Sequence, residues 1–312
     1  MKYILGLPTD HVESVEQFGT ASAIKEMAIA AENLGYFGIF VTDHPAPPAS
    51  FLKAGGHHTL DPMVTLAAAA TVTSRLRVLT NLYIVAYRNP LLAAKAVATL
   101  DNLSEGRLIL GVGAGYLKGE FAATGVTFDE RGDILNQHLE VMRQAWTGEP
   151  ITATGKNYYA EDIVSLPQPI QRSDSLSPPV WVGGNSKNAL ERVALFGEGW
   201  IPMATPKGID KFVQTSPITN LDSLARKINV LLEMWDRHGR SGKPSIAIEP
   251  WDAGRYGAKN WDPETYLERL TQLSELGVTH VPAMLSDIGR DFTASRVKFL
   301  ETVESYAQFV TL

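Results

Sequence analysis

The sequence predicts an α/β protein with the architecture of a (β/α)8 TIM barrel. Eight short apolar segments alternate with segments of helical periodicity from one end of the chain to the other. A doubly wound sheet would show the same alternation, but no composition shift or flexible linker marks a domain boundary within the 312 residues. We therefore expect residues 1–312 to form a single barrel domain.

The strands and helices are predicted from apolar runs and from residues that end helices. The predicted strands cover residues 3–8, 37–42, 77–85, 107–113, 179–184, 199–204, 245–250 and 280–285. Asn89 and Pro90 predict a helix start, because asparagine caps a helix and proline is tolerated in its first turn. Further helices are expected at 24–34, from about 129 to Gly148, from Asn185 to Gly197, and at 297–307.

Two long segments exceed a minimal barrel, namely residues 44–60 and residues 150–178. Loops of this length in a compact domain are usually functional, and loops that follow strands gather on the catalytic face of a barrel. We expect residues 44–60, 205–220 and 251–261 on that face, and 150–178 as an insertion on the same C-terminal (cofactor) face. Their aromatic residues would suit a hydrophobic or aromatic substrate, or would pack the loops onto the barrel: Phe51, Tyr158, Tyr159, Trp251 and Trp261.

The composition excludes several classes of protein. A net charge of −6 argues against nucleic acid or an anionic membrane as the partner. The chain has no cysteine, which excludes disulfides, thiolate metal sites and cysteine nucleophiles. The apolar run at the start is too short for a secretory signal, and no segment is long enough to span a membrane. We expect a soluble cytoplasmic protein.

Three glycines at alternate positions, Gly111, Gly113 and Gly115, follow an apolar run. A dinucleotide-binding fingerprint needs a further glycine three residues after the second, where this chain has Tyr116, and an acidic residue at the end of the next strand. The spacing of the glycines therefore argues against a dinucleotide-binding loop. The glycines indicate either a tight turn or a backbone that approaches a flat ligand at the end of a strand.

A second glycine loop, Gly183-Gly184-Asn185-Ser186, joins a predicted strand to a predicted helix. The free N–H groups and the dipole of a helix N-terminus favour a phosphate there, although a simple capped turn would have the same sequence.

Asp43 and His44 end the second predicted strand, where the catalytic residues of barrels lie. His44 could exchange a proton or donate a hydrogen bond to a ligand, and a solvent-facing turn is the alternative. Two adjacent histidines, His57 and His58, lie in a loop with glycines and are expected to be solvated. The first strand has no metal ligand, so we predict no metal site.

Taken in order, these segments resemble the bacterial luciferase-like superfamily of flavin and deazaflavin oxidoreductases, and within it the branch that uses coenzyme F420. The resemblance covers residues 37 to about 202 and rests on the ordered set "FGIFVTDHP", "RLILGVGAGYLKGEF", "TFDERGDILNQHLEVMRQAWTG" and "PPVWVGGNSKNALERVALFGEGWIP". It implies a TIM barrel with the tricyclic cofactor ring across the C-terminal ends of the strands.

The resemblance also implies roles for individual residues. Asp43 and His44 approach the ring, with His44 as a proton donor or hydrogen-bonding group. A non-proline cis peptide, frequent behind the ring in this family, would fall at Thr80-Asn81. The remaining residues implied to hold the cofactor ring or its phosphate are Gly113, Ala114, Gly115, Gly183, Gly184, Asn185 and Ser186. Some relatives carry an acidic glutamate just after the glycines; this chain has Tyr116 there, a possible proton donor.

The activity implied is hydride transfer between F420 and a small organic substrate. The alternatives are an FMN-dependent monooxygenase that uses O2, and a non-catalytic flavin-binding protein. The acidic tail of F420 would need cations near the phosphate, for which Lys118, Lys156, Arg172 and Lys187 are candidates. A homodimer is expected from the family alone.

Overall fold

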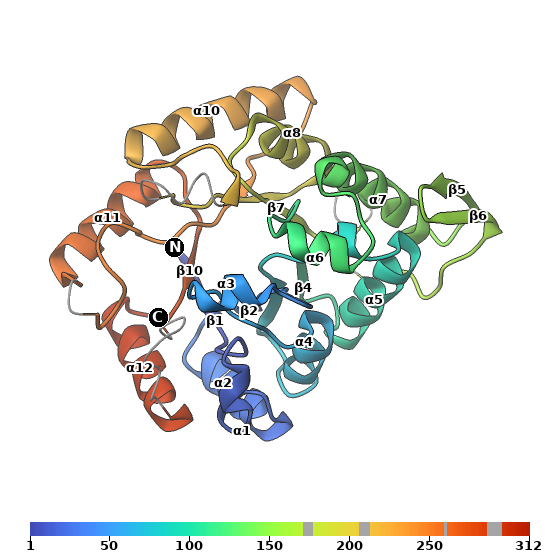
Figure 1. Cartoon of the computed structure of the whole chain (residues 1–312). Helices are drawn as coiled ribbons and strands as arrows, with labels where there is room; N and C mark the ends of the chain where they lie inside the picture. The colour runs from blue at the N-terminus through green and yellow to red at the C-terminus, as the bar shows by residue number, and fades with distance from the viewer. Residues whose placement is uncertain (171–176, 206–212, 259–260, 286–294) are drawn as a thin grey trace.

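The computed structural model describes residues 1–170, 177–205, 213–258, 261–285 and 295–312 (Figure 1). Parallel strands form one sheet in the order β10-β1-β2-β3-β4-β7-β8-β9. An isolated bridge between Ala247 and His280 joins the end of β9 to β10 and nearly closes the ring. The predicted (β/α)8 barrel is confirmed. Its strands are β1 (Lys2–Gly6), β2 (Gly38–Val41), β3 (Arg77–Thr80), β4 (Leu108–Val112), β7 (Val180–Gly183), β8 (Gly199–Ile201), β9 (Ser245–Ile246) and β10 (His280–Ala283).

Helices surround the strands on the outside (Figure 1). The longer ones are α2 (Ala21–Asn33), α4 (Pro62–Ala70), α5 (Pro90–Leu103), α7 (Arg131–Trp146), α8 (Lys187–Phe196), α10 (Leu221–Arg237), α11 (Pro263–Glu275) and α12 (Arg296–Phe309). Shorter helices are α1 (Val15–Phe18), α3 (Ala49–Lys53) and α6 (Lys118–Ala123), with 3₁₀ turns at Val12–Ser14, Val85–Tyr87 and Phe128–Glu130. The predicted starts at Asn89 and Ser186 are confirmed, because each side chain accepts a hydrogen bond from a backbone N–H of its helix.

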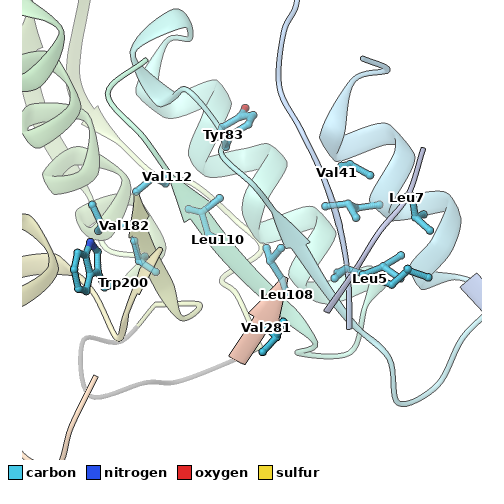
Figure 2. Packing of buried hydrophobic residues seen from close by; sticks show 14 of the residues in the cluster. Leu5, Leu7, Val41, Tyr83, Leu108, Leu110, Val112, Val182, Trp200 and Val281 are labelled. Carbon is cyan, nitrogen blue, oxygen red and sulfur yellow. The ribbon is translucent and has the colours of Figure 1, made fainter. Parts of the chain in front are cut away.

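The core has two layers because successive side chains of a strand face opposite sides. The outer layer packs strands against helices, and Figure 2 shows part of it, with Leu108, Leu110 and Val112 of β4 on one face. The inner layer fills the barrel with one group of side chains from different strands: Ile4, Phe40, Leu79, Ile109, Trp181, Ile201 and Ala247. The barrel interior is therefore filled, and ligands are restricted to its mouth.

The described part of the segment 150–178 forms a structure of its own beside the barrel. It contains an antiparallel hairpin of β5 (Ile151–Gly155) and β6 (Tyr158–Ile163), which lies outside the barrel beside α7 (Figure 1). Gln137 of α7 donates a hydrogen bond to the Thr154 carbonyl, and Lys156 bonds Glu130 just before α7. The described residues of this segment do not line the cavity at the barrel mouth. The reason is connectivity: the hairpin follows a helix and precedes a strand, whereas the loops that follow strands surround the mouth.

Within the described part of the chain, no helix combines the length and the apolar character needed to cross a membrane.

Candidate active site

A cavity of about 630 Å³ lies at the mouth of the barrel. Its lining includes Phe40, Ile201 and Ala247, which belong to the inner core layer and form its floor. The walls come from the segments that follow β2, β3, β4, β7, β8 and β9, together with Pro282 of β10 and Met284 after it. This volume lies within the range of small-molecule and cofactor sites.

Most of the residues predicted from the sequence meet at this cavity. Those that line it are Asp43, His44, Asn81, Gly113, Ala114, Gly115, Tyr116, Gly183, Gly184 and Ser186. Thr80 and Asn185 do not line it, since both are fully buried. The Thr80 hydroxyl donates to the Gly111 carbonyl (2.8 Å), and the Asn185 amide donates to the carbonyls of Met203 and Ser216. These two residues hold neighbouring segments together beneath the cavity surface.

Asp43 joins the end of β2 to the segment after β3. Its carboxylate receives two hydrogen bonds from the Arg88 guanidinium, at 2.6 and 2.9 Å, and one from the Ile84 N–H at 2.9 Å. The guanidinium in turn lies over the ring of Tyr83, with its carbon 4.0 Å from the centroid. A bidentate pair of this kind fixes orientation as well as charge. Asp43 therefore shapes the cavity wall beside His44.

The non-proline cis peptide bond lies between Asn81 and Leu82, one residue later than predicted. The backbone hydrogen bonds of the sheet explain the difference. The Asn81 N–H still donates to the Val41 carbonyl of β2, so regular strand geometry continues through Thr80-Asn81. Both Asn81 and Leu82 line the cavity.

His44 is held by a carboxylate that the sequence analysis missed. Its Nδ1 lies 3.1 Å from Oε2 of Glu120 in α6, and the Glu120 side chain is buried. The same carboxylate accepts hydrogen bonds from the Tyr87 hydroxyl (3.0 Å) and the Ala46 N–H (3.3 Å). Because the carboxylate acts as the acceptor, His44 carries its hydrogen on Nδ1 and keeps Nε2 as the basic atom.

Tyr116 lies on the other side of His44, with its hydroxyl 3.5 Å from Nε2. Burial, together with the charge of Glu120, raises the pKa of Tyr116 to about 12. The phenol is therefore neutral near pH 7 and can donate a hydrogen bond or a proton. The Phe51 ring of α3 lies 5.4 Å from the His44 ring and 6.4 Å from that of Tyr116, between centroids.

The other aromatic residues singled out in the loops pack elsewhere. Tyr158 contacts His138 of α7, and Trp261 packs against Tyr256 and Phe309. Tyr159 is exposed beside Glu161. Among the described residues, no group of three or more histidine or carboxylate side chains is arranged to hold a metal ion.

The glycine loop before α8 has the geometry expected of an anion site. Gly184 has a positive φ of 103°, which turns the backbone into the helix, and the Ser186 hydroxyl accepts from the Ala189 N–H. Two cations line the cavity here, Arg192 of α8 and Arg131 of α7. Helix N-termini and arginines together favour a phosphate.

The cations suggested by the sequence occupy other places. Lys156 pairs with Glu130 at 2.8 Å on the surface, and Lys118 lies against the Phe128 ring. Lys187 does not line the cavity, and Arg172 lies outside the described residues.

Comparisons with known proteins agree with this architecture. The Luciferase-like monooxygenase family model matches residues 1–248. An uncharacterised protein of Mycobacterium tuberculosis is 32% identical over 284 residues, covering 86% of this chain and 89% of the relative. The F420-dependent hydroxymycolic acid dehydrogenase of M. tuberculosis is 32% identical over 196 residues, covering 62% of this chain and 52% of the relative.

Among solved structures, a monooxygenase from Streptomyces bottropensis has a similar fold, with a TM-score of 0.76 at 19% identity; the match covers 100% of this chain and 99% of that one. At this identity the likeness concerns the fold alone. With the family model matched over the strands that carry His44 and both glycine loops, the chain belongs to the luciferase-like monooxygenase family.

Proposed function

We propose that this protein is an oxidoreductase that transfers a hydride between coenzyme F420 and a small organic substrate. The observation that carries the proposal is the cavity itself, where the Glu120–His44 pair faces bare backbone at the ends of β4 and β7. The F420 dependence of the hydroxymycolic acid dehydrogenase supports this cofactor. An FMN-dependent monooxygenase is the second candidate, supported by the fold shared with the S. bottropensis enzyme.

The residues present fit a flat ring with a phosphorylated chain. Gly113, Ala114 and Gly115 give the wall after β4 almost no side chain, which leaves room for a flat ring. Gly183, Gly184 and Ser186 would hold the phosphate at the α8 N-terminus, and Arg131 and Arg192 would neutralise it and the acidic tail. When bound, the cofactor supplies a ring carbon that exchanges hydride, a chemistry that no side chain provides.

In this proposal the remaining predicted residues would position the cofactor or the backbone around it. Asn81 would lie behind the ring and Asp43 beside it, whereas the buried Thr80 and Asn185 would hold the backbone that makes contact.

The side chains around His44 provide the proton chemistry. His44 would accept a proton from a substrate hydroxyl, or return it, at Nε2, while Glu120 fixes the ring through Nδ1. Tyr116 would donate a hydrogen bond to the substrate oxygen. Phe51 contacts both rings, so a substrate with an apolar or aromatic part would suit this side of the site. A homodimer and a cytoplasmic location stay predictions.

The test is a pair of fluorescence titrations of the purified chain, one with F420 and one with FMN. We expect saturable binding of F420 and weak binding of FMN. Binding of FMN alone would favour the monooxygenase, and binding of neither would contradict the assignment of both glycine loops. A chain that binds F420 but exchanges no hydride with a panel of alcohols and carbonyl compounds would be a binding protein.

Two variants locate the ligand. Gly184→Ala places a methyl group in the phosphate seat and should weaken F420 binding about tenfold. Gly239→Ala is the matched control, since Gly239 also has a positive φ (65°) and open space around it but lies after α10, outside the cavity. His44→Ala should bind F420 like the wild type and lose turnover; weakened binding would instead make His44 a cofactor ligand.

A further inference from the structure

A second histidine shares the cavity wall with His44. His57 lies in the loop between α3 and α4, and its side chain is 17% exposed. The two imidazole rings are edge to face, with centroids 4.9 Å apart and an interplanar angle of 83°. The expectation that His57 is solvated is therefore wrong. Its side chain is largely buried and lies beside His44, the proposed proton-transfer residue.

Both imidazoles are fixed through the same ring nitrogen. His57 Nδ1 lies 2.8 Å from the His58 carbonyl oxygen, which can only accept, so Nδ1 carries the hydrogen. His44 Nδ1 is held by Glu120 in the same way. Each ring therefore has Nε2 as its basic atom, and a proton taken up there leaves a full positive charge on that ring.

The charged groups around the pair are unevenly distributed. Asp10 faces His57, with Oδ2 3.9 Å from Nδ1, and His11 and Glu13 act on Asp10 from the same segment. On the other side, Glu120 and Tyr116 face His44.

The pKa values of this second histidine and its acid reflect burial. Burial raises the pKa of Asp10, against the opposing charges of His57 and His11. Burial also lowers the pKa of His57; the hydrogen bond to His58 and the charge of Asp10 oppose this shift, and charges on His44 and His11 add to it. Near pH 7, His57 is therefore neutral.

We infer that His57 is a positioning residue that forms a coupled acid–base pair with His44, in which the two imidazoles hold one proton rather than two. Two positive charges about 5 Å apart in a partly dry cavity repel each other strongly. A proton on one ring therefore disfavours a second proton on the other. The coupling follows from geometry alone, whereas its use in catalysis rests on the proposed function.

The test is an NMR pH titration of the full chain with isotope-labelled histidine and without any cofactor. Replacing His44 by glutamine removes the positive charge that His44 can carry next to His57. The pH at the midpoint of the His57 titration should therefore rise by about one unit. His58→Gln is the matched control: it is the neighbouring residue with the same substitution, its carbonyl still accepts from His57, and the midpoint should not move. An unchanged His57 midpoint in His44→Gln would overturn the inference.

A second measurement uses the unmodified protein. Through its contact with His57, the His44 resonance should show a small second inflection at the His57 midpoint, and His57→Gln should abolish it. A single smooth curve in the wild type would also contradict the coupling. Because neither measurement needs a cofactor, failure of F420 binding and failure of the pair are distinguishable. If the proposed function holds, the acidic limb of the turnover profile should change shape in His57→Gln.

Discussion

Glu120 is the residue on which the geometry of the site depends most. It is fully buried, yet three groups from two segments converge on its two oxygens: His44 and the Ala46 N–H after β2, and Tyr87 after β3. A buried carboxylate is tolerated only when such donors satisfy it. The group that orients the proposed proton donor thus also ties α6 to the ends of β2 and β3.

Replacing Glu120 by alanine should lower the free energy of unfolding by about 2–4 kcal/mol, because the Tyr87 hydroxyl, the His44 ring and the Ala46 N–H all lose their acceptor. Urea denaturation measures the change. Glu140→Ala in α7 provides the control, as Glu140 is exposed and interacts with Gln144 and Arg143 on the same helix, and its effect should stay within about 0.5 kcal/mol. Equal losses in both variants would refute this role for Glu120.

At the scale of elements, β4 and the residues that follow it show why Gly111, Gly113 and Gly115 occupy alternate positions. A Cβ on Gly111 would lie 1.9 Å from the Thr80 carbonyl oxygen of the neighbouring strand, and one on Gly113 would lie 2.9 Å from Leu82 Cδ1. Gly115 has a positive φ of 76°. Close strand contact accounts for the first glycine without any ligand, side-chain packing accounts for the second, and backbone conformation accounts for the third.

This difference predicts unequal effects of the same substitution. Gly111→Ala sets a methyl group against backbone in a closed sheet and should cost about 3 kcal/mol or more in unfolding free energy. Gly113→Ala meets side chains rather than backbone, namely Leu82 (Cδ1 at 2.9 Å, Cβ at 3.3 Å) and Ile84 (Cδ1 at 3.5 Å), and should cost about 1 kcal/mol. Thermal and urea unfolding of the two variants test the order, and a greater loss for Gly113→Ala would reverse the argument.

Helix boundaries were predictable because their causes are local. Asn89, Pro90 and Ser186 cap or begin helices through atoms within three residues, so the sequence alone identified them. Glu120 was missed because its partner His44 is 76 residues away, and only the barrel brings α6 to the end of β2. The hairpin within 150–178 was not predictable for a similar reason: the length of the segment was visible, but the direction of the hairpin along α7 depends on contacts such as Gln137 with Thr154.

For the whole molecule, the end of the barrel opposite the cavity sets part of the pH dependence of stability. His280 is 4% exposed, packs against the rings of Phe37 and Trp181, and leaves Nε2 buried without a hydrogen bond. Burial lowers the pKa of His280 to about 4, with help from Lys2 and the chain N-terminus. The unfolded chain, with a histidine pKa of about 6.5, binds this proton first. Stability should therefore fall as the pH drops from about 6.5 towards 4.

His280→Phe removes this titration. Each pH unit in that window costs the wild type up to about 1.4 kcal/mol from this histidine, so the variant should lose about 2 kcal/mol less than the wild type between pH 6.5 and 4.5. Urea unfolding at the two pH values gives the comparison. An equal loss of unfolding free energy in both proteins would show that His280 has the same pKa in the folded and the unfolded state.

The bridge between Ala247 and His280 closes the ring almost where the family match ends, at residue 248. The proposed proton-transfer residues and both glycine loops precede this seam, whereas Glu249, Arg255, Pro282 and Met284 add to the cavity wall from beyond it. In the proposed function, cofactor binding and part of the substrate wall would thereby be encoded in consecutive stretches of the chain. A barrel arranged in this way could acquire a new substrate through changes in its last fifth, while the part that would hold the cofactor stays unaltered.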